Sequence, residues 1–207
     1  METSADTFLT IAQECHGIYR EKASKFIALA IPAGNEIDVK MNLERIRKEH
    51  HSANHHCYAY RIGLDKNDYR INDDGEPSGS AGKPIFGQIL SHDLSDILII
   101  VVRYFGGTKL GIPGLINAYR TATKDALNNA TIIEKTVMVK FHVSFEYLSM
   151  NDIMRIIKEK NCQVVKQTCD EHCFIELLVR KSDKQTLEER ISNLNNSSIF
   201  LQVHDLV

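Results

Sequence analysis

Apolar runs long enough to cross a membrane are absent from this chain of 207 residues. The longest apolar stretches fall well short of the roughly 20 residues that a membrane helix needs. The N-terminal stretch METSADTFLT lacks the charged and apolar regions of a signal peptide. We therefore expect a soluble cytoplasmic protein with no membrane partner.

An excess of one charge is also missing. Lys and Arg number 25 against 27 Asp and Glu, and the chain up to residue 135 holds 16 basic and 17 acidic residues. A domain that binds nucleic acid over a broad surface usually carries a clear basic excess. Any nucleic-acid contact must therefore come from a local patch.

No CxxC pair is present. The five cysteines are Cys15, Cys57, Cys162, Cys169 and Cys173. Because their number is odd and no export signal precedes them, we expect reduced thiols.

The chain is long enough for two small domains, and its 43% apolar and 25% charged residues are ordinary for a globular protein. Apolar periodicity predicts the elements of the first domain. They are two extended segments within 7–33, helices over 36–50, 84–90 and 114–129, a hairpin of strands at 55–64 and 69–71, and a central strand over 97–105.

The pattern restarts near residue 136. The expected elements are a strand over 137–145, a helix over 149–160, strands over 163–168 and 173–180, a helix over 183–194 and a closing strand over 198–206. This βαββαβ order is typical of ferredoxin-like domains. We predict an α+β protein with domains over residues 1–134 and 135–207.

The stretch VVRYFGGTKLGIPG, residues 101–114, joins the most apolar strand to a helix. Residues 97–124 contain Arg103, Lys109, Arg120 and Lys124 but no Asp or Glu. A glycine-rich turn before a helix can bind an anion through its N–H groups. Glycines such as Gly106 and Gly107 can equally serve tight packing. The loop matches neither the Walker A nor the GxGxxG pattern, and both interpretations stay open.

The acidic stretch DDGEPSG contains Asp73, Asp74 and Glu76. Three carboxylates can hold a divalent cation or act as acid and base. An Asp-Gly turn with solvated charges explains the same residues, and we favour the turn. We therefore predict no metal and no cofactor.

A cluster of histidines precedes Cys57. Its members are His50, His51, His55 and His56, and their spacing matches no standard zinc site. Cys57 beside a histidine could act as a nucleophile, but a buried structural thiol is the commoner case. The same strand carries Tyr58, Tyr60 and Arg61.

Together with Arg103 and Tyr104, these tyrosines and Arg61 could form a platform on which RNA bases stack. Tyrosines that are half-buried in a sheet are the plainer interpretation. No RNP-type motif supports the platform.

Three stretches together resemble the IMPACT family and its bacterial YigZ-type proteins. They are HHSANHHCYAYRIG (50–63), NDDGEPSGSAGKPI (72–85) and VVRYFGGTKLGIPGLINAYR (101–120). One departure lies in the glycine loop, where Pro113 replaces the glycine of the family pattern GxGGL. Because proline has no N–H, it removes one possible anion donor.

The resemblance implies two folds. The first domain should be an α/β sandwich like the second domain of the small-subunit ribosomal protein of the S-five type. The second should be ferredoxin-like and similar to the end domain of elongation factor G. It further implies a role in translation through partners, although the RWD module of the eukaryotic members is missing here.

We therefore expect a non-catalytic, translation-associated regulator that binds RNA, the ribosome or a ribosome-associated protein. The residues assigned to its binding surface are Arg61, Arg103, Tyr104, Gly106, Gly107, Lys109, Arg120 and Lys124. The alternative is a metal-assisted enzyme that acts on a phosphate-containing small molecule, which requires the acidic and glycine loops to meet. A protein-binding adaptor without nucleic-acid contact is a third possibility.

Overall fold

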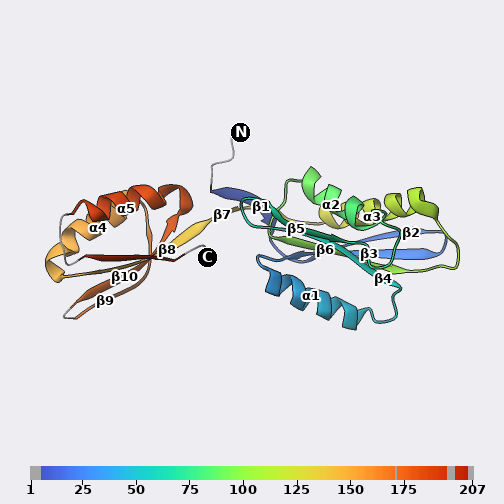
Figure 1. The fold of residues 1–207 in the computed structure, drawn as a ribbon, viewed down its shortest axis with the longest axis horizontal. Helices are drawn as coiled ribbons and strands as arrows, with labels where there is room; N and C mark the ends of the chain where they lie inside the picture. Colours follow the sequence, from blue (N-terminus) through green and yellow to red (C-terminus); the bar gives the residue numbers. More distant parts are fainter. Residues whose placement is uncertain (1–5, 171, 195–198, 205–207) are drawn as a thin grey trace. The chain divides into compact units, whose positions relative to one another are not determined.

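The computed structural model describes residues 6–170, 172–194 and 199–204. They divide into two compact units, each with helices and strands (Figure 1). The first unit comprises residues 8–135, and the second comprises the residues from Thr136 onward together with Asp6 and Thr7. None of the helices described is long and apolar enough to cross a membrane.

The first unit is built on a five-stranded sheet whose neighbouring strands are antiparallel. In spatial order the strands are β2 (Cys15–Glu21), β3 (Ser24–Pro32), β6 (Ile97–Tyr104), β4 (His55–Ile62) and β5 (Asp68–Asn72). β6 lies at the centre of the sheet, between β3 and β4, and is therefore buried on both faces. Its continuous apolar run predicts this position. The predicted hairpin of β4 and β5 is also confirmed.

Helices cover both faces of this sheet (Figure 1). On one face lies α1 (Glu36–Glu49), whose buried Val39 and Ile46 join the side chains of alternate strand residues in one core. On the other face lie α2 (Gly82–Ser91) and α3 (Gly111–Asn128), which share a second core with the remaining strand residues. The two cores follow from the alternation of side chains along each strand.

Two strands of this part were not predicted. They are β2 and β7 (Ile132–Thr136), and β7 pairs with the predicted segment β1 (Thr7–Ile11) in a two-stranded sheet. A two-residue turn joins β2 to β3, with φ of 46° at Lys22 and 64° at Ala23. Such turns usually contain Asn or Gly, so Lys-Ala gives no turn signal in the sequence.

Helix α3 begins at Gly111, three residues earlier than predicted. Pro113 therefore lies in its first turn, where a backbone N–H has no acceptor within the helix. The proline that departs from the family pattern is thus compatible with an early helix start.

The second unit has the predicted order of strands and helices. Its elements are β8 (Met138–Phe145), α4 (Met150–Glu159), β9 (Gln163–Cys169), β10 (Cys173–Arg180), α5 (Lys184–Ser192) and β11 (Phe200–His204), with short 3-10 turns at Tyr147–Ser149 and Lys181–Asp183. The antiparallel sheet runs β11-β8-β10-β9, and α4 and α5 pack on one face. Positions 198, 205 and 206 of the predicted closing strand lie outside the described residues.

The cysteines depart from the prediction of five reduced thiols. Cys169 and Cys173 form a disulfide at the end of the β9–β10 hairpin. The two residues are directly opposite each other in the strand register, so the hairpin itself brings them together. Cys15, Cys57 and Cys162 are free. The odd count in the sequence could not reveal this local pairing.

Candidate binding site

Asp73 organises the acidic loop that follows β5. Its carboxylate accepts hydrogen bonds from the backbone N–H groups of Gly79 (2.8 Å), Ala81 (3.0 Å) and Gly82 (2.8 Å). Burial opposes ionisation, but these donors, together with the charge of Lys83, lower the pKa of Asp73 below its ordinary value. Asp73 thus fixes the entry into α2, in agreement with a structural turn.

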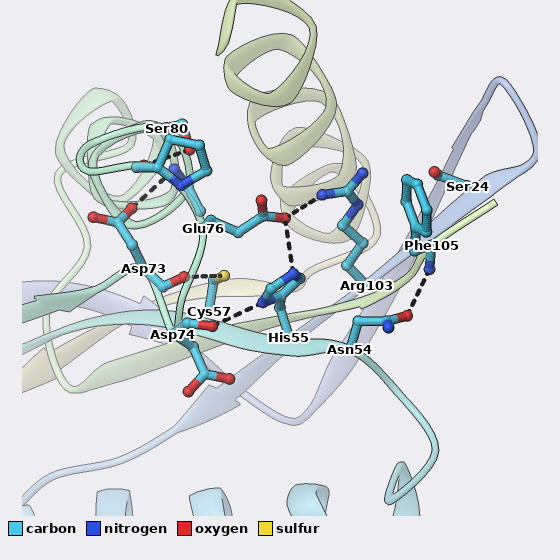
Figure 2. A network of polar contacts seen from close by, with 12 residues as sticks. Ser24, Asn54, His55, Cys57, Asp73, Asp74, Glu76, Ser80, Arg103 and Phe105 are labelled. Carbon is cyan, nitrogen blue, oxygen red and sulfur yellow. Dashed lines mark hydrogen bonds and ion pairs between the residues drawn. The ribbon is translucent and has the colours of Figure 1, made fainter. Parts of the chain in front are cut away.

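Asp74 fixes the start of β4. Its backbone is left-handed, with φ of 42°, and its carboxylate accepts a hydrogen bond of 2.6 Å from the backbone N–H of His56. Its carbonyl oxygen accepts a bond of 2.8 Å from Nδ1 of His55 (Figure 2). The carboxylates of Asp73 and Asp74 therefore serve different parts of the backbone.

Glu76 points into the first unit, where it meets β6 and α3. Its Oε1 accepts hydrogen bonds from Nη1 of Arg103 (2.6 Å) and from the hydroxyl of Tyr119 (2.8 Å). The Arg103 guanidinium also lies 5.4 Å from the ring centres of both Phe26 and Phe105. The acidic loop and the strand before the glycine loop therefore meet, at a buried ion pair.

Arg103 is only 5% exposed, which corrects the expectation that it belongs to a basic surface. It lies on a strand that is covered on both faces, and its charge is already paired with Glu76. The same correction applies to Arg61, which is 4% exposed at the other end of the sheet. Its Nε donates to the carbonyl of Leu94, and its Nη2 donates to Asp93.

Cys57 and His55 complete what we call the Glu76 network, which consists of Glu76, Arg103, Tyr119, Cys57 and His55. Figure 2 labels its members other than Tyr119. The Cys57 thiol donates to the carbonyl of Asp73 at 3.0 Å and lies 3.3 Å from the Tyr119 hydroxyl. Nε2 of His55 is 3.9 Å from Oε1 of Glu76. Burial strongly raises the pKa of the Cys57 thiol, so it stays protonated at neutral pH. This environment is that of a structural thiol.

The prediction of an aromatic platform is wrong for Tyr58 and Tyr60. Tyr58 and Tyr60 are about 95% buried beneath α1, in the core on that face of the sheet. Tyr104 is partly exposed, and its hydroxyl is hydrogen-bonded to Nδ1 of His50 at 2.8 Å. The plainer interpretation, tyrosines packed in a sheet, describes the structure.

The glycine loop uses its first N–H groups within the fold. The amide of Phe105 donates to Oδ1 of Asn54 (2.8 Å), and that of Gly106 donates to the hydroxyl of Ser24 (3.1 Å). A Cβ at Gly106 would lie 2.1 Å from the backbone of Ala23, whereas Gly107 has open space and φ of 85°. Gly106 therefore serves tight packing, and Gly107 serves the turn.

The exposed cations lie further along the chain. Lys109, Arg120 and Lys124 are all exposed, and the last two are four residues apart on α3, so they lie on one side of the helix. Arg120 also lines an open groove of about 420 Å³ between α2 and α3. We call this the α2–α3 groove, and its lining residues are Gly79, Lys83, Pro84, Gly87, Gln88, Ile116 and Arg120.

The α2–α3 groove contains two cations and no carboxylate. The acidic residue of α3, Asp125, instead accepts a hydrogen bond from the backbone N–H of Ile18 on β2. Lys83 was missed as a site residue, although it lies only four residues after the acidic stretch DDGEPSG. Among the residues described, no group of three or more His, Cys, Asp and Glu side chains could hold a metal ion.

Comparison with known proteins identifies the first unit. The family model of the Impact N-terminal domain matches residues 22–127. The IMPACT family member YvyE of Bacillus subtilis (strain 168) is 33% identical over 191 residues, which are 92% of this chain and 88% of its own. The IMPACT family member YigZ of Escherichia coli (strain K12) is 32% identical over 182 residues, covering 87% and 89% of the two chains.

A solved structure, described as the crystal structure of an hypothetical protein, matches 95% of this chain and 96% of its own with a TM-score of 0.70 and 26% identity. The protein is thus of the class that joins an Impact N-terminal domain to a second α+β unit. The chain belongs to the IMPACT family, which confirms the resemblance found in its motifs.

Proposed function

We propose that this protein is a non-catalytic, translation-associated regulator that binds the phosphate backbone of RNA, either free or in the ribosome. The α2–α3 groove carries the proposal, because Lys83 and Arg120 line it without any carboxylate. Lys124, one turn after Arg120 on α3, and Lys109, in the loop before this helix, are exposed as well. Four exposed cations, two of them in a groove whose lining has no carboxylate, suit a backbone of regularly spaced phosphates.

A catalytic role has less support from the same geometry. The groups that could perform chemistry are engaged with one another inside the fold: Glu76 with Arg103 and Tyr119, and Cys57 with the carbonyl of Asp73. An acid, base or nucleophile must reach a substrate. The exposed residues of this unit are instead suited to electrostatic binding.

The link to translation rests on fold resemblance. We propose that residues 1–134 form an α/β sandwich like the second domain of the small-subunit ribosomal protein of the S-five type. We further propose that residues 135–207 form a ferredoxin-like domain similar to the end domain of elongation factor G. The βαββαβ order and the strand order β11-β8-β10-β9 support the second assignment.

RNA affinity measured against salt concentration tests the proposal. If four cations neutralise about four phosphates of a single strand, affinity should fall roughly 50-fold between 50 and 200 mM salt. The double variant Lys83→Gln/Arg120→Gln should reduce the slope of log affinity against log salt by about 1.4. The matched control is Lys40→Gln/Lys48→Gln on α1, which removes the same charge from the opposite face of the sheet.

The control should retain the wild-type slope. Equal slopes for both double variants would show that the α2–α3 groove does not bind the RNA backbone. The proposal as a whole fails if the protein neither binds RNA nor co-sediments with ribosomes at low salt.

A further inference from the structure

The sheet of the second unit has one face that its helices leave open. Along β8 and β10, alternate side chains point inward and form a core with α4 and α5. Both helices lie on the same side of the sheet (Figure 1). The intervening residues therefore form what we call the open face. On the two central strands these residues are Met138, Lys140, His142, Ser144, Phe174, Glu176, Leu178 and Arg180.

Aromatic rings gather at one end of the open face. Phe174 on β10 is paired in register with Ser144 on β8, and His142 is its diagonal neighbour. The His142 and Phe174 rings are 5.3 Å apart between centres and inclined at 58°. On the far side of β8, Phe200 of β11 is also paired with Ser144, and its side chain is 68% exposed. Rings on three adjacent strands thus surround one small residue.

The charges of the open face favour an anionic partner. Its cations are Lys140 on β8, Lys166 on β9 and Arg180 on β10, and its acidic residue on these strands is Glu176. Glu176 is itself paired with Nζ of Lys140 at 3.0 Å and with Nε2 of His142 at 3.3 Å. The excess of cations therefore remains available to phosphates beside the rings.

We propose that the open face binds single-stranded RNA, with unpaired bases stacked on Phe174, His142 and Phe200. Strands in a sheet are about 4.8 Å apart, so rings on neighbouring strands can each accept a base of an extended strand. Bases in a duplex are already stacked on one another and cannot use such rings. A protein partner fits less well, because Ser144 and the charged side chains interrupt the apolar surface.

This site is separate from the α2–α3 groove and does not depend on it. Phosphate contacts in the groove carry no preference for unpaired bases, whereas stacking on rings requires them. The two can therefore be measured independently in the full chain. In the background Lys83→Gln/Arg120→Gln, the groove is neutralised and the open face is unchanged.

The test is the affinity of this background for a fluorescein-labelled oligouridylate and for a duplex RNA of the same length. Phe174→Leu keeps apolar bulk but removes the ring, and should weaken oligouridylate binding roughly 5- to 150-fold, with little change for duplex RNA. Phe174→Tyr keeps a ring and should bind as the background does. Tyr147→Leu removes a 71% exposed ring that precedes α4, and serves as the matched control.

The proposal is overturned if Phe174→Leu binds oligouridylate as tightly as the background, or if the control loses as much. Equal affinity for single-stranded and duplex RNA also overturns it. If only binding to a ribosomal protein depends on Phe174, the open face is a protein site and the proposal is wrong. His142→Leu supplies a second ring deletion should Phe174→Leu fail to fold. If the α2–α3 groove does not bind RNA but the open face does, Phe174→Leu should still weaken oligouridylate binding.

Discussion

Glu76 gives a direct test of how the first unit is held together, because one buried carboxylate oxygen serves two donors. Its side chain is 3% exposed and that of Arg103 is 6% exposed, at a separation of 2.6 Å. Glu76→Gln keeps the shape but leaves the guanidinium without a counter-ion. Removing one partner of a buried pair costs about 3–5 kcal/mol. We expect a loss of this size in the free energy of unfolding of the first unit.

Two features of the site limit its ability to compensate for this substitution. Arg103 lies between the rings of Phe26 and Phe105, and its Nε has no hydrogen-bond partner among the residues described. The guanidinium therefore cannot turn to a new acceptor without disturbing the core. Tyr119, which also donates to Glu76, keeps an acceptor in the glutamine oxygen. Most of the cost should therefore come from the unpaired charge.

Urea unfolding followed by NMR measures this loss, because amide signals from residues 8–135 report the first unit separately. Two units can unfold independently, so a single global transition is not assumed. The matched control is Glu49→Gln, which breaks an exposed i,i+4 pair with Arg45 on α1. That change should cost no more than about 0.5 kcal/mol.

A double-mutant cycle with Arg103→Met completes the test. If the two side chains act as a pair, the double variant should be more stable than the sum of the single losses predicts, by about 0.5–3 kcal/mol. A loss below about 1 kcal/mol for Glu76→Gln, or strict additivity in the cycle, would refute the structural role of the pair.

Three further predictions concern Asp73, the cysteines and the glycine loop. Folding lowers the pKa of Asp73, so its ionised carboxylate stabilises the fold fully above the unfolded pKa of about 3.9. This stabilisation is lost as the pH falls through the folded pKa. The difference in free energy of unfolding between wild type and Asp73→Asn should therefore become smaller in acid titrations. Cys57, which is fully buried, should react with a thiol reagent only on unfolding, whereas partly exposed Cys162 should react first in the native protein. Gly106→Ala should destabilise more than Gly107→Ala in thermal melts, since its Cβ would overlap the backbone of Ala23; equal shifts would contradict the packing role.

The spacing of apolar residues along the chain was sufficient to predict most helices and strands. The continuous apolar run of β6 predicted a central strand, and apolar spacing predicted α1 and both helices of the second unit. Strand β2 was missed because its turn contains Lys22 and Ala23, neither of which indicates left-handed backbone. Pairing between β1 and β7 joins residues more than 100 positions apart, and no local pattern records such pairing.

The site was predicted less well, because burial of a charged side chain depends on its tertiary partner. Arg103 was assigned to a surface from its neighbours in sequence, yet it is the last but one residue of a strand that is apolar on both faces. The apolar run before Arg103 could have indicated its burial, since both faces of such a strand are packed against other elements. The partner that makes burial possible, Glu76, lies 27 positions away in a loop. Lys83 was missed because its role depends on the packing of α2 against α3.

The three family motifs contribute residues to one buried network in the first unit. His55 and Cys57 come from the first, Asp73 and Glu76 from the second, and Arg103 from the third, and their side chains or backbone meet around one buried carboxylate. Such a network specifies how the acidic loop and β4 pack against β6. A match to these motifs therefore identifies the architecture of the first unit more directly than a chemical activity. The RNA contacts that we propose lie outside this network, on the side chains of the α2–α3 groove and of the open face.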